Sequence, residues 1–283
     1  MTLSPLFAGF REAEPPRTGG EALISPDAAR LALATAHAAC DHARAEILPR
    51  FRRVAVETKG DGSPVTEADR AAERAIRKVI AEAFPEDAIL GEEYGNEAGR
   101  SGARRRWVVD PIDGTIAFAR GIPLFTTLVA LLVDDVPVLG VIDLPAVDDR
   151  IGGSLGGGVH RGETRLRVAD APAGPEPLDQ ALVCHGDLFC FDLAGLRPVH
   201  TALSRRVRML RGYTDAFGHL LVLSGAADAM IDCDLNPWDA AVTRVHPREA
   251  GGRCLVRERE DGRKLDLLFG SAAVVQAIGS LES

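Results

Sequence analysis

Short apolar runs alternate with helical stretches along most of the chain, and this alternation restricts the possible folds most strongly. The first helix is expected to follow the cap residue Ser25, with Pro26 at its first position, and to end before Pro49. A second helix with helical apolar spacing is expected between its cap Thr66 and Pro85.

Between and after these helices lie segments with the character of buried strands. Apolar runs at 88–90 and 107–109 precede a hairpin of residues 124–133 and 136–142 around an Asp-Asp turn. The second half adds expected strands at 181–184, 207–210 and 229–232, and expected helices at 217–227 and 236–245. Interleaved strands and helices predict a mixed α/β class.

The bulk composition limits the possible partners. The chain has 283 residues, 46% of them apolar, which suits one large domain or two closely packed halves. A formal net charge of −8 argues against nucleic acid as a partner. The one dense basic run, at 104–106, is expected to be a solvated loop.

Neither the cysteines nor the apolar stretches indicate a secreted or membrane protein. The five cysteines are scattered and form no C-x-x-C pair, which disfavours a zinc site or a disulfide framework. The N-terminus lacks the pattern of a signal peptide, and the apolar stretch at 124–133 is too short to cross a bilayer. We therefore expect a cytoplasmic protein with no membrane partner.

Three segments are expected from the punctuation of the chain. Residues 1–22 contain proline and glycine pairs without periodicity and are expected to form a loose leader. An N-terminal metal-binding half should cover 23–150 and a C-terminal α/β half 151–283. The glycine-rich stretch at 152–158 fits no phosphate-binding loop and is expected to be the turn that joins the halves.

Acidic residues follow several of the apolar runs. Glu92 and its neighbour Glu93 follow one expected strand, Asp110 and Asp113 follow another, and Asp239 opens a late helix. Carboxylates that converge repel one another unless a hard cation neutralises them. Ligand sets made only of oxygen select Mg²⁺ or Mn²⁺ over zinc.

The central motif is DPIDGT at residues 110–115. Its two aspartates, three residues apart, can reach one metal cluster, and Gly114 allows the backbone close to a ligand. Thr115 supplies a hydroxyl and begins a helix-like stretch whose free N–H groups suit an anionic phosphate.

Each of these acids also has a purely structural interpretation. An Asp-Gly pair such as Asp113-Gly114 is a common turn. Asp69 could only complete a capping box with Thr66, and Asp239 could do the same with Asn236. The functional interpretation rests on the agreement of the whole set.

The same segments resemble the inositol monophosphatase superfamily in order and spacing, over about residues 25 to 260. The matching segments are KGDGSPVTEAD (59–69), GEEYG (91–95), WVVDPIDGT (107–115) and NPWDAA (236–241). The resemblance implies a layered αβαβα sandwich. It also implies an Mg²⁺-dependent hydrolase of phosphate monoesters that uses two or three ions and forms no covalent phospho-enzyme.

The resemblance assigns roles to matching residues. Glu92, Asp110 and the carbonyl of Ile112 would bind a first ion, Asp110, Asp113 and Asp239 a second, and Glu92 is a candidate for a third. Thr115, supported by Asp69, would orient or deprotonate the attacking water, and the amides of Gly114 and Thr115 would hold the phosphate. The same resemblance implies a homodimer and sensitivity to lithium.

The substrate is less sharply defined. Segments 121–125 and 140–145, with Asp215, are more similar to the histidinol-phosphate phosphatase branch than to the inositol branch. Asp232 falls at the family's position for the substrate hydroxyl, and with Asp215 it could pair with the ammonium of histidinol. Ile116 and the Cys184–Asp187 segment depart from the histidinol pattern.

These departures leave alternatives open. Inositol 1-phosphate, a sugar phosphate or a phosphorylated amino alcohol could use the same metal site, since Asp232 can also accept a hydrogen bond from a polyol hydroxyl. A non-catalytic metal-binding module would keep the fold without the reaction, but the presence of every expected acid and of Thr115 speaks against it.

Overall fold

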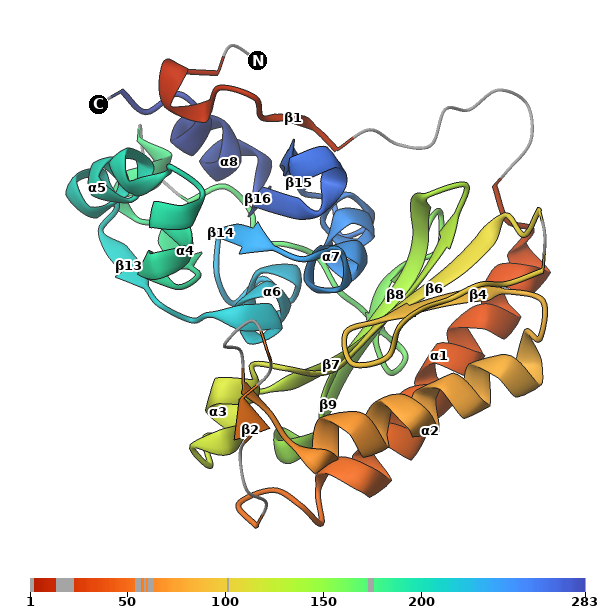
Figure 1. Cartoon of the computed structure of the whole chain (residues 1–283). Coiled ribbons are helices and arrows are strands. Elements are labelled where there is room, and N and C mark those ends of the chain that lie inside the picture. The colour runs from red at the N-terminus through yellow and green to blue at the C-terminus, as the bar shows by residue number, and fades with distance from the viewer. Residues whose placement is uncertain are drawn as a thin grey trace.

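The computed structural model describes residues 3–13, 23–53, 57–58, 60, 64–100, 102–172 and 176–282. Two sheets alternate with three layers of helices in an αβαβα arrangement, which confirms the predicted fold class (Figure 1). Among the described residues, no helix combines the length and apolar character needed to cross a membrane.

Helices α1 (Pro26–Ile47) and α2 (Glu67–Ala83) form the first outer layer. Both begin where capping chemistry places them. The Ser25 hydroxyl accepts a hydrogen bond from the backbone at the start of α1, and Thr66 and Asp69 form a reciprocal capping box on α2. Both predicted helices are confirmed.

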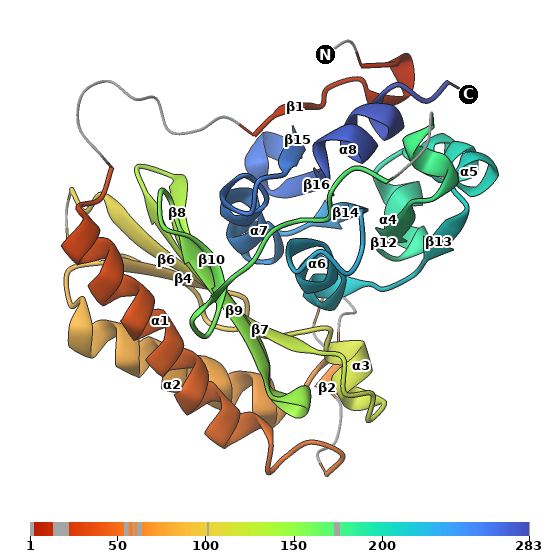
Figure 2. The ribbon, with the colours of Figure 1, turned by 180° about the vertical axis from the view of Figure 1, so that it is seen from behind.

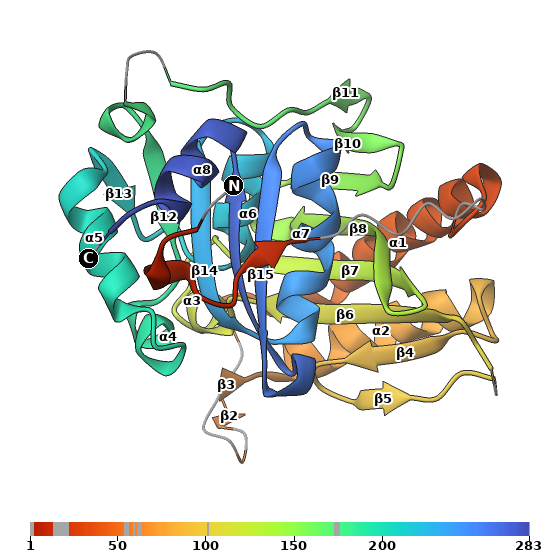
Figure 3. The ribbon, with the colours of Figure 1, turned by 90° about the horizontal axis from the view of Figure 1, so that it is seen from above.

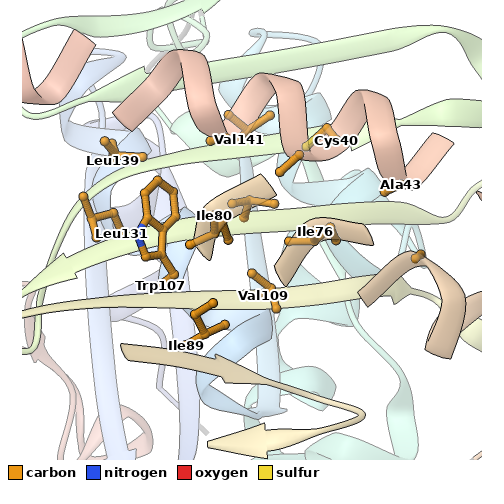
Figure 4. Close-up of a cluster of buried hydrophobic side chains, with 14 of the residues drawn as sticks. Cys40, Ala43, Ile76, Ile80, Ile89, Trp107, Val109, Leu131, Leu139 and Val141 are labelled. Atoms are coloured by element: carbon orange, nitrogen blue, oxygen red, sulfur yellow. The ribbon is translucent and has the colours of Figure 1, made fainter. Parts of the chain in front are cut away.

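The first sheet has eight strands, and α1 and α2 cover its outer face (Figure 2). Its side chains alternate as a two-residue period requires. On β6, Trp107 and Val109 pack against the two helices, as Figure 4 shows, while Val108 faces the middle layer. In spatial order the strands are β11 (Thr164–Arg165), β10 (Gly158–Arg161), β9 (Asp149–Ser154), β8 (Val136–Leu144), β7 (Thr126–Val133), β6 (Arg105–Asp113), β4 (Ala88–Gly91) and β5 (Gly95–Glu97).

The second sheet has six strands that run across the direction of those in the first (Figure 3). On β14, Ile231 packs toward the far helices and Met230 toward the middle layer, again with a period of two. In spatial order the strands are β1 (Arg11–Glu12), β15 (Arg253–Arg259), β16 (Lys264–Gly270), β14 (Ala229–Leu235), β12 (Leu182–His185) and β13 (Met209–Arg211).

The remaining helices complete the layers. Helices α6 (Asp215–Leu223) and α7 (Pro237–Glu249) lie between the two sheets and contribute to the core on both sides. Helices α4 (Leu188–Leu193), α5 (Arg197–Arg206) and α8 (Ala272–Gly279) cover the far face of the second sheet. A short helix, α3 (Thr115–Ala119), follows β6 directly, and β2 (Glu57–Thr58) pairs with β3 (Pro64–Val65) apart from both sheets.

The expectation of a loose leader is wrong for residues 3–13. Phe7 is fully buried, the Ser4 amide donates to the Gly279 carbonyl at 2.8 Å, and β1 pairs with β15. These contacts place the N-terminal segment beside the C-terminus (Figure 1). The rest of the expected leader, residues 14–22, lies outside the described residues.

The glycine-rich stretch does not join the two halves. Residues 152–158 form the end of β9, a turn and the start of β10, all within the first sheet. The first sheet extends to Arg165, past the expected boundary at residue 150, and the chain crosses to the second sheet only afterwards. The division into functional halves stays a prediction.

Two details of β6 also differ from expectation. Arg105 and Arg106 are part of the strand rather than a solvated loop, and they form ion pairs with Asp87 and Asp135. The strand does not break at Asp110-Pro111 but continues to Asp113 with an irregular register between the two aspartates. A proline lacks the N–H needed for regular pairing, so it is tolerated where a strand bulges.

Candidate active site

A cavity of about 480 Å³ lies where β6 and α3 face β14 and the N-terminal ends of α6 and α7. Nearly all of the predicted site residues line it: Glu92, Asp110, Ile112, Asp113, Gly114, Thr115, Asp215, Asp232 and Asp239. A larger cavity of about 730 Å³ lies beside β1, β15 and α7 and contains none of them. The structure therefore gathers residues far apart in the sequence at one place.

Three acids form the centre of this cavity. One carboxylate oxygen each from Asp110, Asp113 and Asp239 lie within 4.8 Å of one another. The irregular register of β6 places Asp110 and Asp113 near each other at the end of the strand, and Asp239 reaches them from the first turn of α7. No regular strand would aim two residues three apart into one cluster, because their side chains alternate between faces.

Burial and mutual repulsion disfavour the charged forms of these acids. Burial raises the pKa of Asp110 well above its ordinary value, and the charges of Glu92, Asp113 and Asp239 raise that pKa further. Burial, followed by the charge of Asp113, likewise raises the pKa of Asp239. Such a group of carboxylates keeps its charges when a cation lies among them.

The donor set fits a hard divalent cation. Asp110 Oδ1 is buried and has no hydrogen-bond partner in the described part of the chain. An orphaned carboxylate oxygen of this kind is costly unless a ligand satisfies it. Every donor in the cluster is oxygen, which suits Mg²⁺ or Mn²⁺ better than zinc.

Asp239 and Asp69 both cap helices, so their structural interpretation is confirmed. Asp239 Oδ2 accepts from the Asn236 amide at 2.8 Å, and Asp69 Oδ2 accepts from the Thr66 amide at 2.8 Å. Asp239 also belongs to the acidic cluster. Asp69 is fully buried and does not line the cavity.

The cavity nevertheless influences the pKa of Asp69. Burial raises its pKa to about 6, Thr66 partly opposes this by hydrogen bonding, and the charge of Glu92 adds to the rise. No hydrogen bond joins Asp69 to Thr115, whose hydroxyl donates to the Ile112 carbonyl at 3.1 Å. That carbonyl is itself a predicted metal ligand, so in this arrangement it is shared with the hydroxyl. The support of Thr115 by Asp69 stays a prediction.

Gly114 and Asp215 lie against each other in the lining of the cavity. Gly114 has φ +83°, and a Cβ on it would lie 3.0 Å from Asp215 Oδ2. Asp215 itself adopts φ +58°, a left-handed conformation that is strained for a residue other than glycine. Burial raises the pKa of Asp215 well above its ordinary value, with the charges of Asp113 and Asp232 next in importance.

Sequence reasoning missed several residues of the cavity. Asp187, Asp234 and Lys264 line it, and so does the buried His219. His219 follows Asp215 by four residues, a spacing that places both residues on one face of a helix. This spacing could have indicated that His219 lines the same cavity as Asp215. Lys264 comes from β16, a strand that carries no motif, and nothing in the sequence pointed to it.

Known proteins are similar to this chain in both sequence and fold. The inositol monophosphatase family matches residues 29–277. A histidinol-phosphatase of Chlorobaculum parvum is 37% identical over 203 residues, covering 72% of this chain and 76% of that protein. An inositol-1-monophosphatase of Mesorhizobium japonicum is 34% identical, covering 77% of this chain and 80% of that protein.

Among solved structures, the extragenic suppressor protein SuhB of Bartonella henselae superposes with a TM-score of 0.78 at 26% identity, covering 88% of this chain and 96% of that one. The family match spans the whole first sheet, every strand of the second sheet except β1, and every acid of the cavity. The chain therefore belongs to the inositol monophosphatase family.

Proposed function

We propose that this protein hydrolyses a small phosphate monoester at a Mg²⁺ centre, and that its substrate is histidinol phosphate. The observation that carries the proposal is the convergence of Asp110, Asp113 and Asp239 within 4.8 Å in one cavity. Family membership supports the same reaction class.

The proposed metal ligands are the acids of the cluster, with Glu92 and the Ile112 carbonyl. When bound, Mg²⁺ would neutralise these carboxylates and polarise the phosphoryl oxygens. The chain's part is to hold the acids in place before the ion arrives. The irregular end of β6 and the capping box of α7 support that role.

The remaining roles belong to groups beside the cluster. The amides of Gly114 and Thr115 are proposed to hold the phosphate, and the Thr115 hydroxyl to orient the attacking water. Asp69 is proposed to act through its charge, because its hydrogen bonds go to Thr66.

An ammonium-bearing substrate is favoured by the carboxyl groups of the cavity that lie outside the central cluster. Asp187, Asp215 and Asp232 all line the cavity. A cationic organic group placed among them gains charge-assisted hydrogen bonds. The similarity to a protein named histidinol-phosphatase points the same way.

A polyol phosphate is the second candidate. Asp232 can accept a hydrogen bond from a hydroxyl as well as from an ammonium group. The relative named inositol-1-monophosphatase, at 34% identity, favours this alternative.

The test is a phosphate-release panel on the purified protein with and without Mg²⁺. We expect release that depends on Mg²⁺, with kcat/KM for histidinol phosphate above that for inositol 1-phosphate and sugar phosphates. Faster turnover of inositol 1-phosphate would overturn the substrate assignment, and no release from any monoester would overturn the enzymatic one.

We also propose that the protein is a homodimer. Light scattering on the same sample tests this proposal.

A further inference from the structure

Three groups confine the side chain of Asp232, and none has a predicted role. Its Oδ2 lies 2.9 Å from His219 Nε2, and its Oδ1 accepts from the Cys233 amide at 3.0 Å. On the remaining side, a Cβ at Gly186 would lie only 2.0 Å from Oδ1. The carboxylate of Asp232 therefore has one available orientation.

The His219 ring is itself fixed from behind. Its Nδ1 lies 2.6 Å from Thr243 Oγ1, and the ring makes a T-shaped contact with Phe269, with ring centroids 5.0 Å apart. A carboxylate oxygen only accepts, so Nε2 carries a proton and donates to Asp232. In the neutral imidazole Nδ1 then accepts from the Thr243 hydroxyl.

This chain of hydrogen bonds links three elements around the cavity. Thr243 lies on α7, His219 on α6 and Asp232 on β14, and all three side chains are buried. Thr243 follows Asp239 by four residues on the same helix. These hydrogen bonds thus connect Asp232, the proposed substrate-binding carboxylate, to α7, the helix that carries Asp239.

We infer that His219, held by Thr243, is a positioning residue that sets selectivity for the organic part of the substrate by fixing Asp232. The inference rests on the proposed function, since it assumes that Asp232 contacts the substrate. A purely structural His219 would only pack α6 against its neighbours. Its loss would then affect all monoesters equally.

The first experiment compares wild type with His219→Leu on two substrates, both with Mg²⁺. One is the monoester turned over fastest in the phosphate-release panel. The other is 4-nitrophenyl phosphate, whose aryl group offers no hydroxyl or ammonium to Asp232. We expect KM for the first substrate to rise about 10- to 100-fold, with little change in kcat. A rise of this size corresponds to the loss of one hydrogen bond between the substrate and the charged carboxylate of Asp232. The kinetics of 4-nitrophenyl phosphate should stay within about twofold.

A double-mutant cycle tests whether His219 acts through Asp232. In the Asp232→Asn background, His219→Leu should produce almost no further rise in KM. Additive effects would show that His219 contacts the substrate itself, and this would overturn the positioning role.

Two further variants reach Asp232 by other routes. Gly186→Ala should reproduce the selective rise in KM, because its new methyl group displaces Oδ1. Thr243→Val should show a smaller rise in the same direction, while Thr243→Ser keeps the hydroxyl and should match wild type. Thermal melts of every variant identify those that fail to fold.

The failures of the two proposals are distinguishable. Without release from either substrate in wild type, the proposed function is wrong. With normal release but equal losses on both substrates in folded His219→Leu and Gly186→Ala, the function stands and the positioning role is overturned.

Discussion

The Asp113 carboxylate accepts a hydrogen bond from the backbone amide of Ala216 at 2.7 Å, across 103 positions of sequence. The same oxygen, Oδ2, also accepts from the Thr126 hydroxyl at 2.8 Å. Asp113 therefore joins the end of β6 to the first turn of α6. It aligns the acidic cluster with the strained Asp215 beside Ala216.

Replacing Asp113 by Asn should separate the chemical role of this residue from its structural one. The amide oxygen can still accept both hydrogen bonds, but the charge is lost. We expect phosphate release to fall on the order of 100-fold or more. In EDTA the melting temperature should stay the same or rise, because one of several repelling buried acids is gone. Retained phosphate release in folded Asp113→Asn would revive a non-catalytic role.

Asp69→Asn tests whether this capping residue also contributes to the reaction. An Asn side chain can preserve the acceptor for the Thr66 amide, so stability should change by about 1 kcal/mol or less. If the negative charge matters at the site, kcat should fall about tenfold or more. Thr66→Ser is the control, since it retains the cap and the charge. Unchanged kcat in folded Asp69→Asn would leave Asp69 with capping alone.

Gly114→Ala should damage both stability and activity. Its φ of +83° is strained for alanine, and the methyl group would press on Asp215 Oδ2 at 3.0 Å. Gly262 has a similar φ of +81° with nothing within 4 Å, so Gly262→Ala measures the backbone strain by itself. We expect both variants to lose about 1 kcal/mol of unfolding free energy, and only Gly114→Ala to lose activity. Equal kinetics in the two variants would contradict the close approach.

His246 should make stability depend on pH. It is buried on α7, its Nε2 lies 3.0 Å from the Gly140 carbonyl, and burial lowers its pKa from 6.5 to about 4. Below pH 6.5 the unfolded chain binds a proton at this residue while the folded protein does not, so the folded state loses stability as the pH falls toward 4.

The comparison is with His246→Gln, which can still donate to Gly140 but does not titrate. Between pH 7 and 5, the stability of wild type relative to this variant should fall by roughly 1 to 2 kcal/mol in urea unfolding. The difference between the two proteins removes the contribution of the acidic cluster. A difference that does not vary with pH would mean that His246 titrates normally in the folded protein.

The sequence predicted correctly those helices and strands whose ends depend on nearby residues. The caps Ser25 and Thr66 and the prolines after the first two helices marked α1 and α2, because helix ends depend on nearby residues. Residues 3–13 gave no such signal, since β1 exists only through its pairing with β15, far along the chain. The hairpin at 152–158 was missed although its pairing is local, because a glycine-rich segment lacks the apolar and β-branched residues that mark a strand.

The residues of the cavity also divide into those that nearby sequence predicted and those that it did not. Glu92 and the three acids of the central cluster were identified because each follows an apolar strand or opens a helix, and such positions can be read in the sequence. His219 was missed because its role depends on Asp232 and Thr243, which lie on different elements. The continuation of β6 through Pro111 depends on a bulge opposite β7, which no pattern in β6 alone specifies.

Helices α6 and α7 contribute to the packing of both sheets, and the walls of the cavity come from residues on either side of them. Neither sheet with its own outer helices therefore contains a complete cavity. A partly folded chain in which one sheet has formed would give part of the native circular dichroism signal without a complete cavity. Recovery of activity during refolding should thus report the docking of the two sheets.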